Sequence, residues 1–341
     1  MRVKRGSVAC LLAANRMRGA RVPRTAIASA LVGALAACAA PGVPLASLTT
    51  PKPLEAGRQH LYWADPTLDW TISQLDPLAA TATIGGSNLD GSGMSESAVT
   101  GVESPCGVAV DGGHLYWANR RQGGIGRSNL DGNALDNLFV QAAAGSYPCG
   151  VAVDANYIYW ANHGSTALGT TIGRAALDGT AVNSAFINAA LNPCGVAVDA
   201  DYIYWANEGL SSTGGGSIGR ARLDGSGADP AFILMDAWIP CGVAVDGGYV
   251  YWANSLAGTI GRARLDGSAK ENSFISGARW PCGLAVDATY VYWGNGGAWS
   301  GSTGAPAVGR ARLDGSAVDQ AWLHGMKGIC GVAIDPASGD P

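Results

Sequence analysis

Six cysteines recur at nearly equal intervals, and their thiols offer three kinds of chemistry. Each stands directly before a glycine, at Cys106, Cys149, Cys194, Cys241, Cys282 and Cys330. A buried cysteine acts as a small hydrophobe, an oxidising compartment allows disulfides, and thiolates bind metals such as zinc. No C-x-x-C pair is present to start a zinc site, so the sequence predicts no metal.

Acid–base chemistry has a weaker basis in the sequence. The four histidines, His60, His114, His163 and His324, occupy dissimilar places, and no G-x-S-x-G, H-E-x-x-H or nucleotide-binding glycine loop occurs. However, His163 and Glu208 each follow a Tyr-Trp-Ala-Asn string. That pair leaves open an enzyme of the lactonase or lyase type, although we predict no catalytic residue and no cofactor.

The cysteines belong to a longer repeat. A C-G-V-A-V-D string is followed by Y-W-A/G-N/D, then by I-G-R-x-x-L-D-G, then by a short apolar run such as A-F-I. The cysteines are 41 to 48 residues apart, a period typical of propeller blades. The alternating β-branched and aromatic residues predict strands, and the Asp-Gly pairs predict hairpin turns. Each repeat therefore predicts four antiparallel strands.

The two ends of the repeat region complement each other. It opens at His60 with a second strand that has no first strand before it, and it ends at Cys330–Asp335 with a first strand that has no second. If the carboxyl-terminal strand joins the amino-terminal blade, the ring closes without an exposed sheet edge. We predict an all-β, six-bladed β-propeller over residues 60–341.

These strings resemble the YWTD repeats, or class B repeats, of the low-density lipoprotein receptor family. The resemblance covers residues 60–335 and implies that the Tyr and Trp residues are structural. It also implies a propeller that binds proteins or serves as a scaffold, without naming a ligand. The chain departs from the family pattern because Ala or Gly replaces Thr in every copy, and the final Asp is kept only at Asp65.

The amino-terminal segment has the features of an export signal. The apolar run Thr25–Ala37 is too short to span a bilayer as a helix, and it ends in L-A-A-C, which resembles a bacterial lipobox. We predict a signal peptide over residues 1–37, with Met17 as an alternative start, and lipidation of Cys38. A flexible tether over residues 38–59 then leads to the propeller. The expected location is the bacterial cell envelope, with a secreted protein as the alternative.

The charge distribution excludes one class of partner. Seven of the 22 basic residues and none of the 26 acidic residues precede Cys38, so the rest of the chain has a net charge of −11. An acidic body lacks the basic face that phosphates require, so we predict no nucleic-acid partner. Membrane contact is expected only through the lipid anchor, and the chain is expected to be a monomer.

Strand direction assigns the connections to two faces of the ring. The turns between strands 1 and 2 and between strands 3 and 4 of each repeat lie on one face, which we call the turn face. The loops between strands 2 and 3 (2–3 loops) and the connections from strand 4 to strand 1 of the next blade (4–1 crossovers) lie on the opposite face, which we call the crossover face. The two longest 2–3 loops on it are Pro66–Thr83 and Gly296–Ala307. Aromatic residues on loops of a rigid scaffold are typical of recognition surfaces. We therefore predict a protein or glycan ligand on this face, and the candidate residues are Trp70, Tyr147, His163, Glu208, Trp238, Trp280 and Trp299. A purely structural envelope protein is a further alternative.

The six cysteines are expected to form a structural ring near the axis, at the crossover face. By strand alternation each Cys shares its side with both Val residues of C-G-V-A-V-D, which favours burial between blades. Disulfides require Cα atoms about 5.5 Å apart, and residues one blade apart are expected to exceed that distance. Free, disulfide-bonded and metal-bound states all stay open from the sequence.

Overall fold

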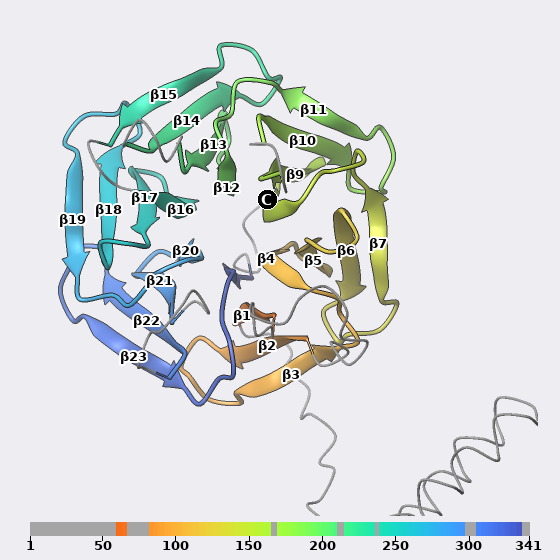
Figure 1. Cartoon of the computed structure of the whole chain (residues 1–341). Coiled ribbons are helices and arrows are strands. Elements are labelled where there is room, and N and C mark those ends of the chain that lie inside the picture. The colour runs from red at the N-terminus through yellow and green to blue at the C-terminus, as the bar shows by residue number, and fades with distance from the viewer. Residues whose placement is uncertain are drawn as a thin grey trace, which may run out of the picture. The chain divides into compact units, whose positions relative to one another are not determined.

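The repeats build a ring of six blades (Figure 1). The computed structural model describes residues 59–66, 82–164, 169–209, 215–235, 239–296 and 305–335. In that part of the chain, 24 strands form six antiparallel sheets of four strands each, and no helix is present. The predicted six-bladed β-propeller is therefore confirmed.

In each blade the first strand lies nearest the axis and the fourth lies outermost (Figure 1). Blade 1 contains β24 (Val332–Ile334), β1 (His60–Asp65), β2 (Thr83–Asn88) and β3 (Ser95–Thr100). Blade 2 contains β4 (Pro105–Val110), β5 (His114–Asn119), β6 (Gly124–Asn129) and β7 (Asp136–Gln141). Blade 3 contains β8 (Pro148–Val153), β9 (Tyr157–Asn162), β10 (Thr171–Ala176) and β11 (Asn183–Ile187).

The other three blades follow in the same order. Blade 4 contains β12 (Pro193–Val198), β13 (Tyr202–Asn207), β14 (Ser217–Arg222) and β15 (Asp229–Leu234). Blade 5 contains β16 (Pro240–Val245), β17 (Tyr249–Asn254), β18 (Thr259–Arg264) and β19 (Glu271–Ser276). Blade 6 contains β20 (Leu284–Val286), β21 (Tyr290–Asn295), β22 (Ala307–Arg312) and β23 (Asp319–His324).

The ring closes through strands from opposite ends of the repeat region. β24 pairs antiparallel with β1, and Tyr62 stands opposite Ala333. Beside this pair, His60 Nδ1 lies 2.7 Å from Asp335 Oδ2, and both side chains are largely buried. The closure expected from the unmatched first and second strands is confirmed.

The Trp of each Y-W string builds the core between blades. Trp117 on β5 is fully buried and packs with Tyr62 and Ile84 of blade 1. Its indole lies over Gly126, the residue paired with it on β6, and a Cβ at Gly126 would overlap the ring. The Gly of I-G-R therefore provides the space that the Trp occupies, and this pairing recurs in all six blades.

The Asp residues that follow the first strands cap the turns to the second strands. Asp199 Oδ1 accepts hydrogen bonds from the amides of Asp201 at 2.9 Å and Tyr202 at 2.7 Å, and Oδ2 accepts one from the Tyr204 hydroxyl at 3.0 Å. Burial, and then the charge of Asp199, raises the pKa of Tyr204 above its ordinary value. The same arrangement in blades 2, 3, 5 and 6 fixes the turn face.

The amino-terminal predictions fall outside the described residues. The signal peptide, the lipidation of Cys38 and most of the tether lie within residues 1–58, and they stay predictions. Among the residues that the structure does describe, no helix is long and apolar enough to cross a membrane.

Candidate functional site

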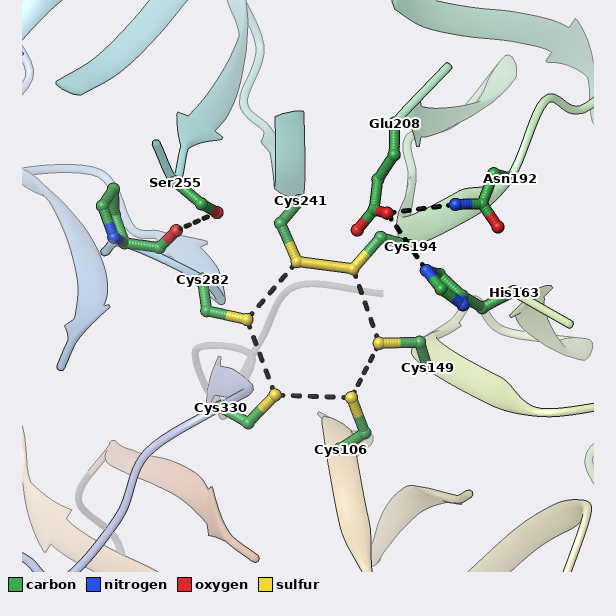
Figure 2. Close-up of a disulfide and its surroundings, with 11 residues drawn as sticks. Cys106, Cys149, His163, Asn192, Cys194, Glu208, Cys241, Ser255, Cys282 and Cys330 are labelled. Carbon is green, nitrogen blue, oxygen red and sulfur yellow. Dashed lines mark hydrogen bonds and ion pairs between the residues drawn. A yellow bond between two sulfur atoms is a disulfide. The ribbon is translucent and has the colours of Figure 1, made fainter. Parts of the chain in front are cut away.

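The six repeated cysteines meet at the axis in a closed ring of sulfur atoms (Figure 2). Cys194 and Cys241 are joined in a disulfide, with their Cα atoms 5.2 Å apart. The other neighbouring sulfurs are 2.7 Å apart for Cys106–Cys149, 3.5 Å for Cys149–Cys194, 3.4 Å for Cys241–Cys282, 3.5 Å for Cys282–Cys330 and 3.3 Å for Cys330–Cys106. Each sulfur therefore has one neighbour on each side.

A β-bulge directs the cysteines toward the axis. In blade 4, Pro193 pairs with Asn207 but Val196 pairs with Trp205, so the register shifts by one residue across Cys194 and Gly195. Blades 2, 3 and 5 have the same shift. A bulge re-aims a side chain, and the cysteines pack on one another while Val196 joins the core between blades. The expectation that Cys and Val share one side of the strand is wrong for this reason.

The glycine after each cysteine brings the inner strands together. A Cβ at Gly150 would lie 2.6 Å from the Cys194 carbonyl oxygen and 2.8 Å from the Gly195 Cα. The same contact with the next inner strand recurs at Gly107, Gly150, Gly195, Gly242, Gly283 and Gly331. The expectation that cysteines one blade apart are too distant for a disulfide is therefore wrong, because the missing side chains let the strands approach.

Burial and mutual contact keep the free thiols protonated. Hydrogen bonding with Cys106, followed by burial, raises the pKa of Cys149 well above its ordinary value. The hydrogen bond with Cys149 lowers the pKa of Cys106, but the contact with Cys330 and burial outweigh it, and the net pKa is well above the ordinary value. Arg120 acts against both increases through its positive charge.

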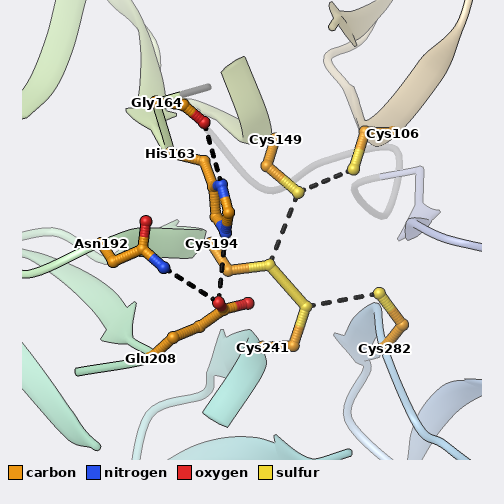
Figure 3. Close-up of polar contacts among 9 residues, drawn as sticks. All are labelled: Cys106, Cys149, His163, Gly164, Asn192, Cys194, Glu208, Cys241 and Cys282. Atoms are coloured by element: carbon orange, nitrogen blue, oxygen red, sulfur yellow. Dashed lines mark hydrogen bonds and ion pairs between the residues drawn. A yellow bond between two sulfur atoms is a disulfide. The ribbon is translucent and has the colours of Figure 1, made fainter. Parts of the chain in front are cut away.

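Polar side chains stand beside the ring on the crossover face (Figure 3). Glu208 Oε2 accepts a hydrogen bond from Asn192 Nδ2 at 3.0 Å and lies 3.1 Å from His163 Nε2. His163 Nδ1 lies 3.3 Å from the Gly164 carbonyl oxygen. Both ring nitrogens therefore face oxygen atoms, and the imidazole is held between the Gly164 carbonyl and the Glu208 carboxylate. The structure brings the sequence candidates His163 and Glu208 together.

The strand ends explain why these residues meet. His163, Glu208 and Arg120 each follow the Asn that ends a second strand, and Ser255 has the same position in blade 5. In blade 4, Asn207 Nδ2 donates to the Pro230 carbonyl at 2.9 Å, which ties strand 2 to strand 4. A carboxylate cannot donate that bond, so the Asn that stands where the YWTD pattern has Asp has a structural role here.

Three further polar residues at this end of the sulfur ring were not predicted from the sequence. Asn192 precedes the Pro-Cys pair of blade 4, and Arg120 lies near Glu208 and several ring cysteines. Ser255 Oγ donates to the Pro281 carbonyl at 2.7 Å (Figure 2). Their positions, directly after a Y-W-A-N string or directly before Pro-Cys, are the signal that would have identified them.

One group of side chains has the spacing of metal ligands. Donor atoms of Cys194, Glu208 and Cys241 lie within 4.8 Å of one another. The two sulfurs are bonded to each other in the disulfide, whereas metal ligation requires thiolates. These residues therefore offer a metal-binding set only after reduction.

The remaining sequence candidates have different outcomes. Trp70, Trp238 and Trp299 lie outside the described residues. Tyr147 is half-buried, and its carbonyl accepts a hydrogen bond from the His163 amide at 3.2 Å. Trp280 is half-buried and adopts φ +50°, a left-handed conformation that is rare for a bulky residue. Ser104 and Asn192 hold the equivalent crossover position with φ of +42° and +56°.

Three leucines give the crossover face exposed apolar surface. Leu191, Leu234 and Leu256 are 46%, 63% and 60% exposed, the largest values for big apolar side chains in the described part of the chain. They lie in the crossover between blades 3 and 4, at the end of β15, and in the 2–3 loop of blade 5. The repeat pattern did not predict the exposure of these leucines.

The turn face has a cavity of its own, which the sequence analysis did not predict. It has a volume of about 680 Å³ and is lined by turns of blades 5, 6 and 1, including Asp246, Asp287 and Asp335. Asp246 and Asp287 already accept hydrogen bonds from backbone amides and tyrosine hydroxyls. Because these carboxylates are engaged, we take the crossover face as the better candidate.

Comparison with known proteins agrees with the repeat and the fold. Residues 113–155 match the family model described as low-density lipoprotein receptor repeat class B. No curated protein sequence matches the chain. A chain in the crystal structure of a nidogen/laminin complex superimposes with a TM-score of 0.65 at 17% identity, over 82% of this chain and 99% of that chain. Likeness at this identity shows the propeller fold.

Proposed function

We propose that this propeller is a binding module whose crossover face recognises a protein partner. The observation that carries the proposal is the exposure of Leu191, Leu234 and Leu256 on one face of a rigid ring. Exposed apolar side chains beside polar ones are typical of protein interaction sites. His163 and Glu208 supply polar groups on the same face. Glycans, in contrast, are usually bound through polar and aromatic surfaces, so the leucines favour a protein.

The backbone at Trp280 supports the same face. A tryptophan at φ +50° stores strain, and strained residues cluster at functional sites. The similar propeller chain was crystallised in a nidogen/laminin complex, which supports a protein partner by analogy only. We further propose that the chain is exported and anchored through Cys38, so that the propeller acts at the cell envelope.

A pair of matched variants tests the proposed face. Leu234→Glu/Leu256→Glu places two charges on the crossover face, and Val182→Glu/Val318→Glu places two on the turn face, where each valine is 44% exposed. Partners are captured by in-cell cross-linking and quantified by mass spectrometry. We expect one set of proteins captured by the wild type and the turn-face variant and lost from the crossover-face variant. Equal capture by both variants would contradict the proposal, and no captured protein in any sample would favour a structural role.

A second candidate function rests on a separate observation. His163, Glu208 and Asn192 converge at the mouth of the ring (Figure 3), as a lactonase- or lyase-type site would require. Hydrolysis or elimination measured on a panel of lactones and uronate oligosaccharides tests it. Activity that is lost in both His163→Gln and Glu208→Gln, but kept in Ser255→Ala, would support an enzyme. A rate at background for the wild type would exclude the tested reactions.

A further inference from the structure

The sulfur ring has a simple combinatorial property. Six cysteines in a closed ring, each beside two others (Figure 2), can pair completely in only two ways. One way joins Cys106–Cys149, Cys194–Cys241 and Cys282–Cys330. The other joins the three alternate neighbours. Any other choice of bonds leaves two cysteines without a neighbour to pair with.

The bond already present selects one of the two pairings. Since Cys194 is bonded to Cys241, their outer neighbours Cys149 and Cys282 must pair away from them. Cys149 has Cys106 at 2.7 Å, and Cys282 has Cys330 at 3.5 Å. A bond between Cys106 and Cys330, which are 3.3 Å apart, would leave two thiols stranded on opposite sides of the ring.

We propose that the ring oxidises to three inter-blade disulfides, Cys106–Cys149, Cys194–Cys241 and Cys282–Cys330, which form a covalent girdle around the propeller axis. They join blades 2 and 3, blades 4 and 5, and blades 6 and 1. The last bond matters most for closure, because only Gly331 separates Cys330 from the short strand β24 that completes blade 1.

The oxidant is a small disulfide such as oxidised glutathione, and the chemistry is thiol–disulfide exchange. One cysteine thiolate attacks a glutathione sulfur, which forms a mixed disulfide and releases one glutathione thiolate. The neighbouring cysteine thiolate attacks the protein sulfur of that bond, closes the inter-blade disulfide and releases the second. Each pair loses two electrons and two protons, and two molecules of reduced glutathione carry them away.

Exposure sets the order of reaction. Cys282 and Cys330 are half-buried, whereas Cys106 and Cys149 are buried. All four free thiols have raised pKa values, so the greater exposure of Cys282 and Cys330 is what separates the two pairs. Cys282–Cys330 should therefore close before Cys106–Cys149.

Peptide mapping of the full chain tests the proposal, because trypsin places every cysteine on a peptide of its own. The protein is reduced, incubated with oxidised glutathione, blocked with N-ethylmaleimide and digested without reductant. We expect three cross-linked peptide pairs in the stated combination, with Cys282–Cys330 first. Reducing the oxidised protein should lower its Tm by about 10 to 20 °C, because the three loops do not overlap and their effects add. The proposal would be overturned by any of three results. These are ring cysteines that stay free and carry N-ethylmaleimide, ring thiols protected by a metal that a chelator removes, or the alternate pairing.

A single substitution separates the two pairings even if yields are low. In the proposed pairing, Cys282→Ser frees the thiol of Cys330 and leaves the other two disulfides intact. In the alternate pairing, the same substitution frees Cys241. Labelling at Cys330 supports the girdle, and labelling at Cys241 overturns it. The matched variant Cys106→Ser should free Cys149 and leave Cys330 unlabelled.

Discussion

Adding a single methyl group to the glycine ring should destabilise the propeller. In Gly150→Ala, the new Cβ would lie 2.6 Å from the Cys194 oxygen, 2.8 Å from the Gly195 Cα and 2.8 Å from the Val196 nitrogen. All three atoms belong to the backbone of the next inner strand, so no side chain can rotate away and the strands must separate. Overpacking costs about 1–3 kcal/mol, and the lower entropy of the unfolded Ala chain returns about 0.4–1 kcal/mol. We expect a net loss of about 1 kcal/mol.

Gly247→Ala is the matched control, because nothing lies within 4 Å of a Cβ at that turn. Urea unfolding followed by tryptophan fluorescence, with both variants kept reduced, gives the free energies of unfolding. A loss of about 1 kcal/mol corresponds to a Tm lower by about 2–4 °C in a domain of this size class. If Gly150→Ala and Gly247→Ala differ by less than about 0.5 kcal/mol, the close approach of the inner strands is refuted.

Three further outcomes follow from local contacts. Tyr204→Phe removes the hydroxyl that donates to the turn-capping carboxylate and should lower the free energy of unfolding by about 1–2 kcal/mol, whereas Tyr202→Phe should leave it nearly unchanged. Trp280→Asn should keep or raise the free energy of unfolding, since Asn tolerates the left-handed backbone at φ +50°. The same substitution should weaken partner capture, and unchanged capture would show that Trp280 is not part of the binding site. Hydrogen bonds from the Ser226 side chain and amide lower the pKa of Asp224 below 3.8. The Asp224 carboxylate therefore stabilises the folded state above pH 3.8, and this stabilisation is lost as the pH falls through its lower pKa in the folded state. The free energy of unfolding of Asp224→Asn should therefore fall less on acidification than that of the wild type.

The fold was predictable because its determinants are local and repeated. Each string carries its own strand pattern, and the Asp-Gly turns set the hairpins. The ring closure followed from the unmatched strands at His60 and Cys330. The Trp of Y-W and the Gly of I-G-R occur in every repeat, although only the structure shows that one fills the space left by the other.

The geometry at the axis was less predictable. Strict alternation placed Cys194 beside Val196, but the bulge across Cys194–Gly195 breaks that alternation. The distance between neighbouring inner strands depends on packing around the whole ring, which no single repeat encodes. The Gly after each Cys was the available signal, since a residue without a Cβ marks a close approach of two backbones.

The crossover-face site was predictable only in part. His163 and Glu208 were found because they occupy equivalent places in consecutive repeats. Asn192 was missed because the residue type before Pro-Cys differs from repeat to repeat, and its left-handed backbone cannot be deduced from a residue that precedes proline. The exposure of Leu234 was also hidden, because A-F-I-L is typical of a buried outer strand and burial is decided by neighbouring loops.

Amide hydrogen exchange of the propeller alone and with its captured partner tests the proposed binding face most directly. The account predicts slower exchange on binding in the crossover-face segments 189–192, 208–209 and 254–258, with no change in the 1–2 and 3–4 turns. Slower exchange confined to those turns, around the cavity lined by Asp246 and Asp287, would contradict the account and assign recognition to the opposite face.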